Sequence, residues 1–122
     1  MHIKLTTVTL GAPDARALAA FYRDLLGGEL VWNDPGWVVL QSPNSALGIA
    51  FQEEAQHRAP VWPGQAGDQQ MQIHLEIRVD DLDAGVAHAL ACGATLAHFQ
   101  PQDDVRVCLD PAGHPFCLWT ET

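Results

Sequence analysis

The chain has 122 residues and a hydrophobic fraction of 48%, which suits one domain with a core of its own. Its formal net charge is −9, and its 6 basic residues are scattered, which argues against a surface for nucleic acid or anionic membranes. No apolar run approaches the roughly 20 residues of a membrane span, and the N-terminus lacks the apolar core of a signal peptide. Three cysteines do not fit a secreted disulfide framework. We therefore expect a cytoplasmic protein.

The first half of the sequence predicts a strand, a helix and three further strands. A strand over residues 7–10 precedes a helix that begins after Asp14, an N-cap residue, and ends at Gly27. The apolar residues of this helix have the spacing of an amphipathic stripe: Leu18, Phe21, Tyr22 and Leu25. The three strands that follow are predicted at 29–32, 37–40 and 46–52.

The first hairpin is predicted from the turn sequence Asn33-Asp34-Pro35-Gly36. If this turn is centred between Asp34 and Pro35, Trp32 faces Trp37 across the two strands. Such a pair is typical of cross-strand packing, but tryptophans can also form the wall of a binding site.

Residues 53–70 show no periodicity and contain two prolines and two glycines. A connection of this length without regular structure is unusual inside a compact domain and is often functional. Trp62 lies in this linker and could close over a binding site from it.

The stretch 72–79 alternates between apolar and polar residues, which predicts a half-buried strand. Its apolar side should pack on a helix. Its polar side carries His74, Glu76 and Arg78 in consecutive positions. This side is either a salt-bridged outer face or the floor of a polar cleft.

The second half repeats the order of the first. A helix is predicted to begin after Asp80-Asp81 and to end at Gly93, with a stripe of Leu82, Val86 and Leu90. Strands are predicted at 94–99, 105–109 and 116–119, with a turn at 110–113. The helix-ending glycines and the turn sequences fall at equivalent places in the two halves, which indicates an internal duplication of a βαβββ module.

The second hairpin has a predicted register of its own. If its turn is centred between Ala112 and Gly113, Cys108 faces Cys117 and Arg106 faces Trp119, all on one side of the sheet. The two cysteines are then either a cross-strand disulfide, a pair of metal thiolates, or two small and mildly apolar side chains in a reducing cytosol.

The duplication and four sequence segments carry a resemblance to a known family. The segments are Phe21-Tyr22 through Leu25-Leu26-Gly27, His74-Leu75-Glu76 followed by Val79-Asp80-Asp81-Leu82, Leu90 to Ala94, and Asp110 to Phe116. The chain resembles the vicinal oxygen chelate superfamily, which includes glyoxalase I, extradiol dioxygenases such as dihydroxybiphenyl dioxygenase, and the bleomycin and fosfomycin resistance proteins.

The resemblance implies an α+β fold in which two βαβββ modules form a curled, cup-shaped mixed sheet with helices on the outside. Module one is expected at about 5–52, the linker at about 53–70 and module two at about 71–122, in a single glyoxalase-like domain. Members of the superfamily commonly form homodimers.

The resemblance also implies four metal-ligand positions, which hold Thr7, Ala50, His74 and Cys117 in this chain. Only His74 matches the usual pattern, because Cys117 stands where a glutamate is usual. We therefore expect no obligatory metal cofactor. If a divalent metal is bound, His74 and Cys117 are the expected ligands.

The leading functional hypothesis is a small-molecule-binding protein, similar to the bleomycin resistance proteins, that holds a planar organic ligand or antibiotic in the cup. The expected binding residues are His74, Glu76, Trp62, Trp119, Cys117, Arg106 and Trp37. One alternative is a glyoxalase-like enzyme, a lyase, isomerase or dioxygenase, with His74 and Glu76 as catalytic candidates and a divalent metal. A second alternative is a structural or regulatory dimer.

Overall fold

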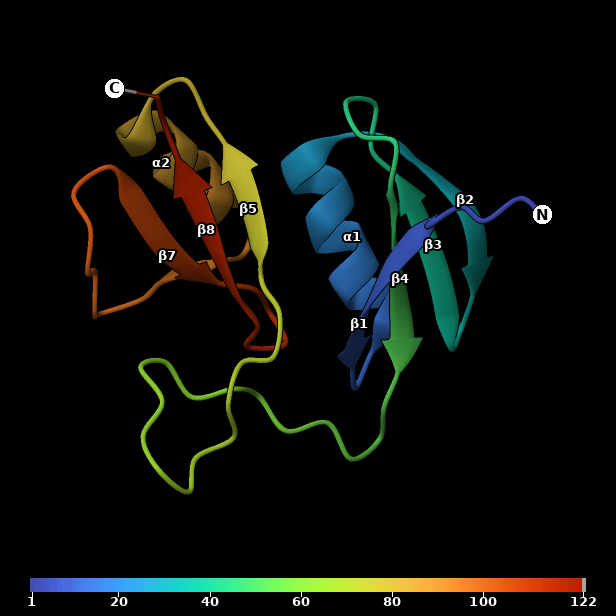
Figure 1. The fold of residues 1–122 in the computed structure, drawn as a ribbon, viewed down its shortest axis with the longest axis horizontal. Helices are drawn as coiled ribbons and strands as arrows, with labels where there is room; N and C mark the ends of the chain where they lie inside the picture. The colour runs from blue at the N-terminus through green and yellow to red at the C-terminus, as the bar shows by residue number, and fades with distance from the viewer. Residues whose placement is uncertain (122) are drawn as a thin grey trace. The chain divides into compact units, whose positions relative to one another are not determined.

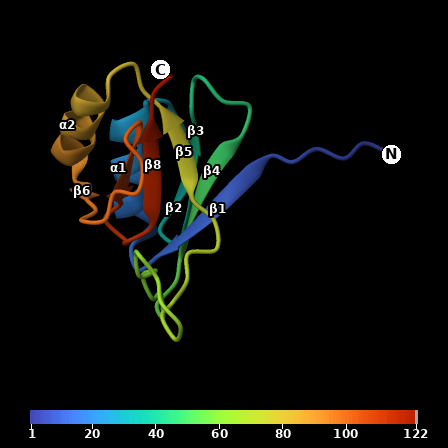
Figure 2. The same cartoon turned by 60° about the vertical axis from the view of Figure 1, so that its left-hand side comes forward.

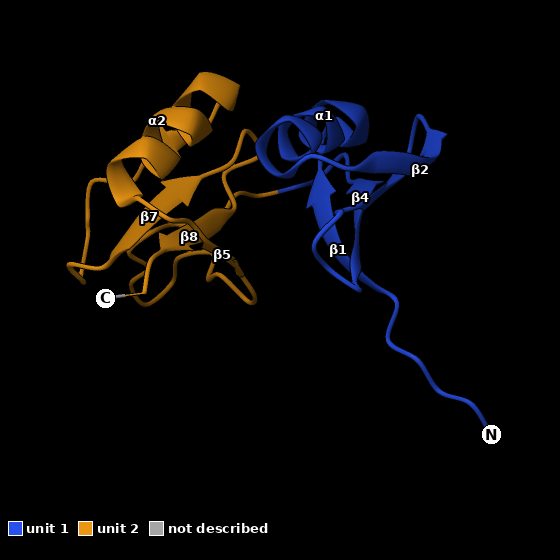
Figure 3. Cartoon of the chain, turned by 90° about the horizontal axis from the view of Figure 1, so that it is seen from above, with its two compact units in different colours: residues 1–57 blue, residues 58–122 orange. Residues whose placement is uncertain are grey.

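The computed structural model describes residues 1–121, which form two compact units divided between His57 and Arg58 (Figure 3). Each unit contains a strand, a helix and three further strands in that order (Figure 1). Each unit also has its own four-stranded mixed sheet. The predicted α+β class and the duplication of a βαβββ module are thus confirmed. Neither helix has the length and apolar character needed to cross a membrane, within the described residues.

The first unit is built around one helix. Its elements are β1 (Thr7–Ala12), α1 (Ala15–Leu26), β2 (Glu29–Asp34), β3 (Trp37–Gln41) and β4 (Gly48–Glu53). The strand order is β1-β4-β3-β2, with β1 and β4 parallel and the other pairs antiparallel. The Asp14 side chain accepts a hydrogen bond from the Ala17 amide, as an N-cap does. Residues 1–6 have no regular structure and extend away from β1 (Figure 2).

The second unit repeats this plan. Its elements are β5 (Leu75–Arg78), α2 (Leu82–Cys92), β6 (Thr95–Leu96), β7 (Val105–Leu109) and β8 (Pro115–Trp119), in the sheet order β5-β8-β7-β6. Helix α2 covers one face of this sheet (Figure 3). The predicted strands at 72–79 and 94–99 are both shorter in the structure. The predicted stripe of α2 is wrong at its end, because the Leu90 side chain is exposed and Ala89 is the buried residue instead.

The register of the second hairpin differs by one residue from the sequence prediction. Cys108 pairs with Phe116, Val107 with Cys117 and Arg106 with Leu118. The cause is a loop of three residues rather than two: Gly113 donates a hydrogen bond to the Asp110 carbonyl and has a φ of 86°, as in a turn closed by a left-handed glycine.

The shifted register places Cys108 and Cys117 on opposite faces of the sheet, since partners in a ladder share a face. Cys108 is fully buried, Cys117 nearly so, and both are free thiols. The predicted pairings of Cys108 with Cys117 and of Arg106 with Trp119 are therefore wrong. A cross-strand disulfide between the two cysteines is wrong as well, because their side chains lie on opposite faces.

The first hairpin also differs from its prediction. Pro35 and Gly36 form the connection, so that Asp34 pairs with Trp37 and Trp32 pairs with Val39. A register shift follows between Leu30 and Trp32. The Trp32 indole is largely exposed and donates a hydrogen bond to Asp34 Oδ2 at 2.8 Å. The predicted pair of Trp32 and Trp37 is thus absent.

Candidate binding site

The candidate site lies on the face of the second sheet that α2 leaves uncovered. Glu76 of β5 pairs with Cys117 of β8, which pairs in turn with Val107 of β7. Because paired residues share a face, and side chains two apart on a strand do so as well, Trp119 lies on this face beside Cys117. A carboxylate, a thiol and an indole are brought together in this way on two adjacent strands.

Trp62 covers part of the same face. It packs against a small buried cluster of Ala97, Val107 and Cys117. Its indole nitrogen donates a hydrogen bond to the Phe99 carbonyl at 3.2 Å, and the two rings lie 6.0 Å apart. The Trp62 indole is thus held by packing against the cluster that contains Cys117 and by a hydrogen bond.

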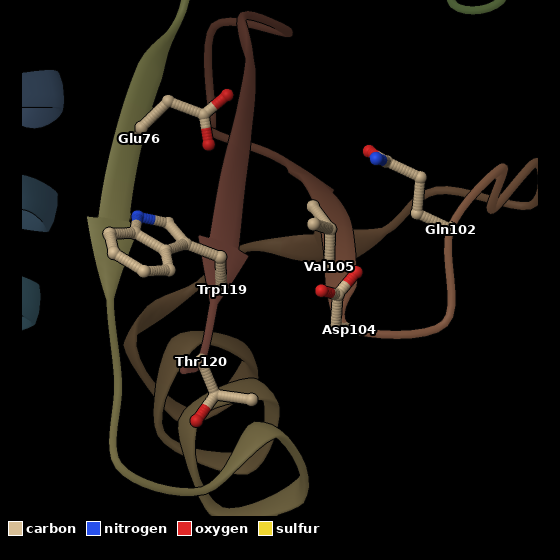
Figure 4. Close-up of a pocket in the computed structure, with 6 residues that line it drawn as sticks. All are labelled: Glu76, Gln102, Asp104, Val105, Trp119 and Thr120. Atoms are coloured by element: carbon tan, nitrogen blue, oxygen red, sulfur yellow. The ribbon is translucent and has the colours of Figure 1, made fainter. Parts of the chain in front are cut away.

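A pocket of about 380 Å³ opens beside Trp119. Its lining residues come from β5, β7, β8 and the adjoining loop: Glu76, Gln102, Asp104, Val105, Trp119 and Thr120. Figure 4 shows Glu76 and Trp119 on one side of the pocket and Gln102, Asp104 and Val105 on the other. The volume lies within the range of small-molecule sites. The lining combines one aromatic wall with several hydrogen-bonding groups.

Three potential metal ligands adjoin this pocket. His74 Nε2 lies 2.8 Å from Glu76 Oε1, which is hydrogen-bond distance. The ligand atoms of His74, Glu76 and Cys117 all lie within 4.8 Å of one another. Glu76 thus connects the exposed imidazole to the buried thiol.

The Cys117 thiol is held in its protonated form. Burial raises its pKa to about 11, and the negative charge of Glu76 and a hydrogen bond to that carboxylate act in the same direction, as does a weaker effect of Cys108. A thiolate at Cys117 would be almost fully buried and would lie beside a carboxylate. At neutral pH this cysteine is therefore a hydrogen-bond donor and not a nucleophile.

The family model of a glyoxalase-like domain matches residues 7–119, which is most of the chain. The chain belongs to the glyoxalase-like family. None of the curated proteins matches it by sequence. The earlier resemblance to the vicinal oxygen chelate superfamily is therefore confirmed at the level of the family.

Solved structures share the fold of this glyoxalase-like chain at low sequence identity. A glyoxalase/bleomycin resistance protein/dioxygenase family enzyme from Burkholderia phytofirmans PsJN is 23% identical, with a TM-score of 0.70 over 97% of this chain and 98% of that one. An antibiotic-binding protein from Streptomyces sp. CB03234 is 18% identical, with a TM-score of 0.66 over 100% and 99% of the two chains. The fosfomycin resistance protein FosX from Listeria monocytogenes is 16% identical, with a TM-score of 0.72 over 100% and 96%.

The donor types at the site fit a zinc ion, because imidazole, carboxylate and thiolate are all zinc ligands. One feature opposes tight binding: the Cys117 thiol must lose a proton that its raised pKa holds firmly.

Two of the residues predicted for the site do not belong to this face of the second sheet. Arg106 faces away from Trp119, and its Nη1 donates to the carbonyls of Gln102, Asp103 and Val105. Its assignment to the face of Trp119 is corrected by the one-residue shift of the hairpin. Trp37 belongs to the first unit, where it pairs with Asp34 and Gln52. A binding role for Trp37 stays a prediction.

The sequence reasoning did not find four of the residues that line the pocket: Gln102, Asp104, Val105 and Thr120. Val105 follows from the corrected register, since it pairs with Trp119. Gln102 and Asp104 lie in the loop before β7, where no periodicity indicates which side chains turn inward.

Proposed function

We propose that this glyoxalase-like chain binds a planar organic molecule, a metabolite or an antibiotic, in the pocket beside Trp119 and without an obligatory metal. The pocket itself carries the proposal: it is large enough for a small ligand and joins an indole to the side chains of Glu76, Gln102 and Thr120. The free thiol of Cys117 and the imidazole of His74 adjoin it through Glu76.

The expected affinity comes from two kinds of contact. Stacking on the Trp119 indole should contribute about 0.5–1.5 kcal/mol beyond the burial of apolar area. Each hydrogen bond to a lining side chain should add on the order of 1 kcal/mol. Polar groups on both sides of the pocket also give it the means to select a ligand by orientation.

Two of the solved structures with this fold support a small-molecule-binding function. The Streptomyces protein of this fold is described as antibiotic-binding, and the Listeria protein as a fosfomycin resistance protein. Their likeness to this chain is one of fold, so the proposal depends on the residues of this pocket. It does not depend on the activities of the relatives.

A titration of tryptophan fluorescence tests the proposal. Planar aromatic metabolites and antibiotics from a broad library should quench the emission of the wild-type protein saturably, because a ligand stacked on Trp119 alters the surroundings of its indole. A library in which no compound gives saturable quenching or a shift of the thermal melt would contradict it.

A second candidate is a glyoxalase-like enzyme that uses a divalent metal. It is favoured by the grouping of His74, Glu76 and Cys117 within 4.8 Å. A metal bound there would act as a Lewis acid on a substrate oxygen. With His74 and Cys117 as the ligands of the metal, the chain's own contribution would be the carboxylate of Glu76, which lies beside both and could accept a proton.

Metal analysis separates the two candidates. We expect untagged protein to purify with well below one transition-metal ion per chain, because Cys117 retains its proton. Elemental analysis by mass spectrometry is the measurement. One firmly bound ion per chain that is lost in both His74→Ala and Cys117→Ala, and kept in Cys92→Ala, would favour the enzyme instead.

We also propose a homodimer. The edge strand β2 exposes Val31 and Trp32, each with 57% of its surface accessible, and a second copy is the simplest partner to cover such an edge. Multi-angle light scattering at micromolar concentration should give twice the chain mass of 13.3 kDa. A mass of one chain at all concentrations would refute the dimer, and with it the alternative of a structural or regulatory dimer.

A further inference from the structure

We infer that the ligand of the pocket is an organic cation: a planar ring system that bears an amidinium, guanidinium or ammonium group. This inference rests on the proposed function and names the chemical class of its ligand. It is carried by the charges of the lining side chains together with the aromatic wall that they flank.

Carboxylates lie on two sides of the pocket. Glu76 comes from β5, and Asp104 comes from the end of the loop before β7, with the Trp119 indole on the side of Glu76 (Figure 4). The remaining lining residues are neutral, so the six side chains that form the pocket carry two negative charges and no positive charge.

The nearby arginines are engaged with other groups. Arg78 pairs in the ladder with Trp119 and shares its face, but its Nη1 forms an ion pair with Glu121 Oε1 at 3.1 Å, exposed to solvent. The Nη1 of Arg106 binds three backbone carbonyls on the opposite face. Neither guanidinium contacts Glu76 or Asp104 through any of these bonds.

The imidazole of His74 contacts one of the two carboxylates: its Nε2 lies 2.8 Å from Glu76 Oε1.

The Trp119 indole is a second reason to expect a cation, separate from the charges of Glu76 and Asp104. The face of an indole attracts a cation through the ring quadrupole, most strongly among the aromatic side chains. A flat cationic ring can stack on Trp119 while its N–H groups donate charge-assisted hydrogen bonds to Glu76 or Asp104. A planar anion would meet the same indole and two repelling carboxylates.

Three nearly isosteric probes test this inference: 2-naphthamidine, which is cationic, 2-naphthamide, which is neutral, and 2-naphthoate, which is anionic. Their affinities for the full chain are measured at pH 8 by ligand-observed NMR and by calorimetry. We expect the amidine to bind about tenfold more tightly than the amide, and the carboxylate to bind least. Raising the salt concentration should reduce the advantage of the amidine, since exposed charges are screened.

Matched variants locate the effect. Asp104→Asn and Glu76→Gln should each reduce the advantage of the amidine over the amide by about threefold, whatever the change in the affinity for the amide. Asp103→Asn removes the same charge one residue away from the lining and should leave the selectivity unchanged. Binding of the amide or the carboxylate as tightly as the amidine would overturn the inference and leave the proposed function standing. If none of the three probes binds at millimolar concentration, the proposed function fails for ligands of this size, and the inference fails with it.

Discussion

Replacing Trp119 by alanine should weaken the binding of a planar ligand by about 10- to 100-fold. The variant loses stacking of about 0.5–1.5 kcal/mol and part of the apolar area that the ligand buries, at about 25 cal/mol per Å². Since the side chain is only half-buried and lies at the last residue of β8, the thermal melt should change little. Calorimetry with the tightest ligand from the fluorescence screen gives the affinity of each variant.

Trp32→Ala is the matched control, because it removes the same indole from the exposed edge strand β2 of the first unit, and its mass by light scattering is measured alongside to show that the oligomeric state is kept. We expect it to leave the affinity unchanged.

His74→Ala should weaken binding by several-fold, since it removes the hydrogen-bond partner of Glu76. If Trp119→Ala and His74→Ala both unfold and no planar compound binds the wild type, these residues serve packing and pairing alone.

Raising the pH from 9 to 11 should lower the free energy of unfolding by about 2 kcal/mol for each of the two buried thiols. Burial raises the pKa of Cys108 from 9.0 to about 11, and burial and the charge of Glu76 do the same for Cys117. The folded chain therefore holds these protons more firmly than the unfolded chain. The stabilisation is complete below pH 9 and is lost as the pH rises towards 11.

Urea unfolding under reducing conditions measures this dependence on pH. Cys108→Ala and Cys117→Ala should each lose part of the decrease seen in the wild type, whatever their stability at pH 8. Cys92→Ala is the control, because Cys92 lies on α2 and is only half-buried, and it should keep the full decrease. A decrease of equal size in all four proteins would show that other groups titrate.

The sequence predicted the order of elements because strong local signals mark their ends. Asp14 caps α1, Asp81 caps α2, and the glycines at 27 and 93 close the two helices in the structure as in the prediction. The registers of the hairpins were wrong because they depend on loop length. Gly113 adopts a left-handed conformation and adds one residue to the loop, which no hydrophobic pattern reports.

The sequence predicted those residues of the candidate site whose side-chain direction follows from the alternation of a strand. His74 and Glu76 came from the polar side of one strand, and Cys117 and Trp119 from two positions on another. The opposite wall lies in the loop before β7, where a side chain's direction depends on local hydrogen bonds. The structure was needed to show that Gln102 and Asp104 complete the pocket and that Arg106 does not.

The most direct measurement is a two-dimensional NMR spectrum of the four tryptophan indole N–H groups, assigned by single Trp→Phe variants and recorded during a titration with a ligand. If the pocket beside Trp119 is the binding site, the Trp119 signal should move most and saturate with the measured affinity, while that of Trp32 should stay in place. A ligand that binds while the Trp119 signal stays unchanged, and that moves the signals of Trp32 or Trp37 instead, would place the site outside this pocket and contradict the proposal.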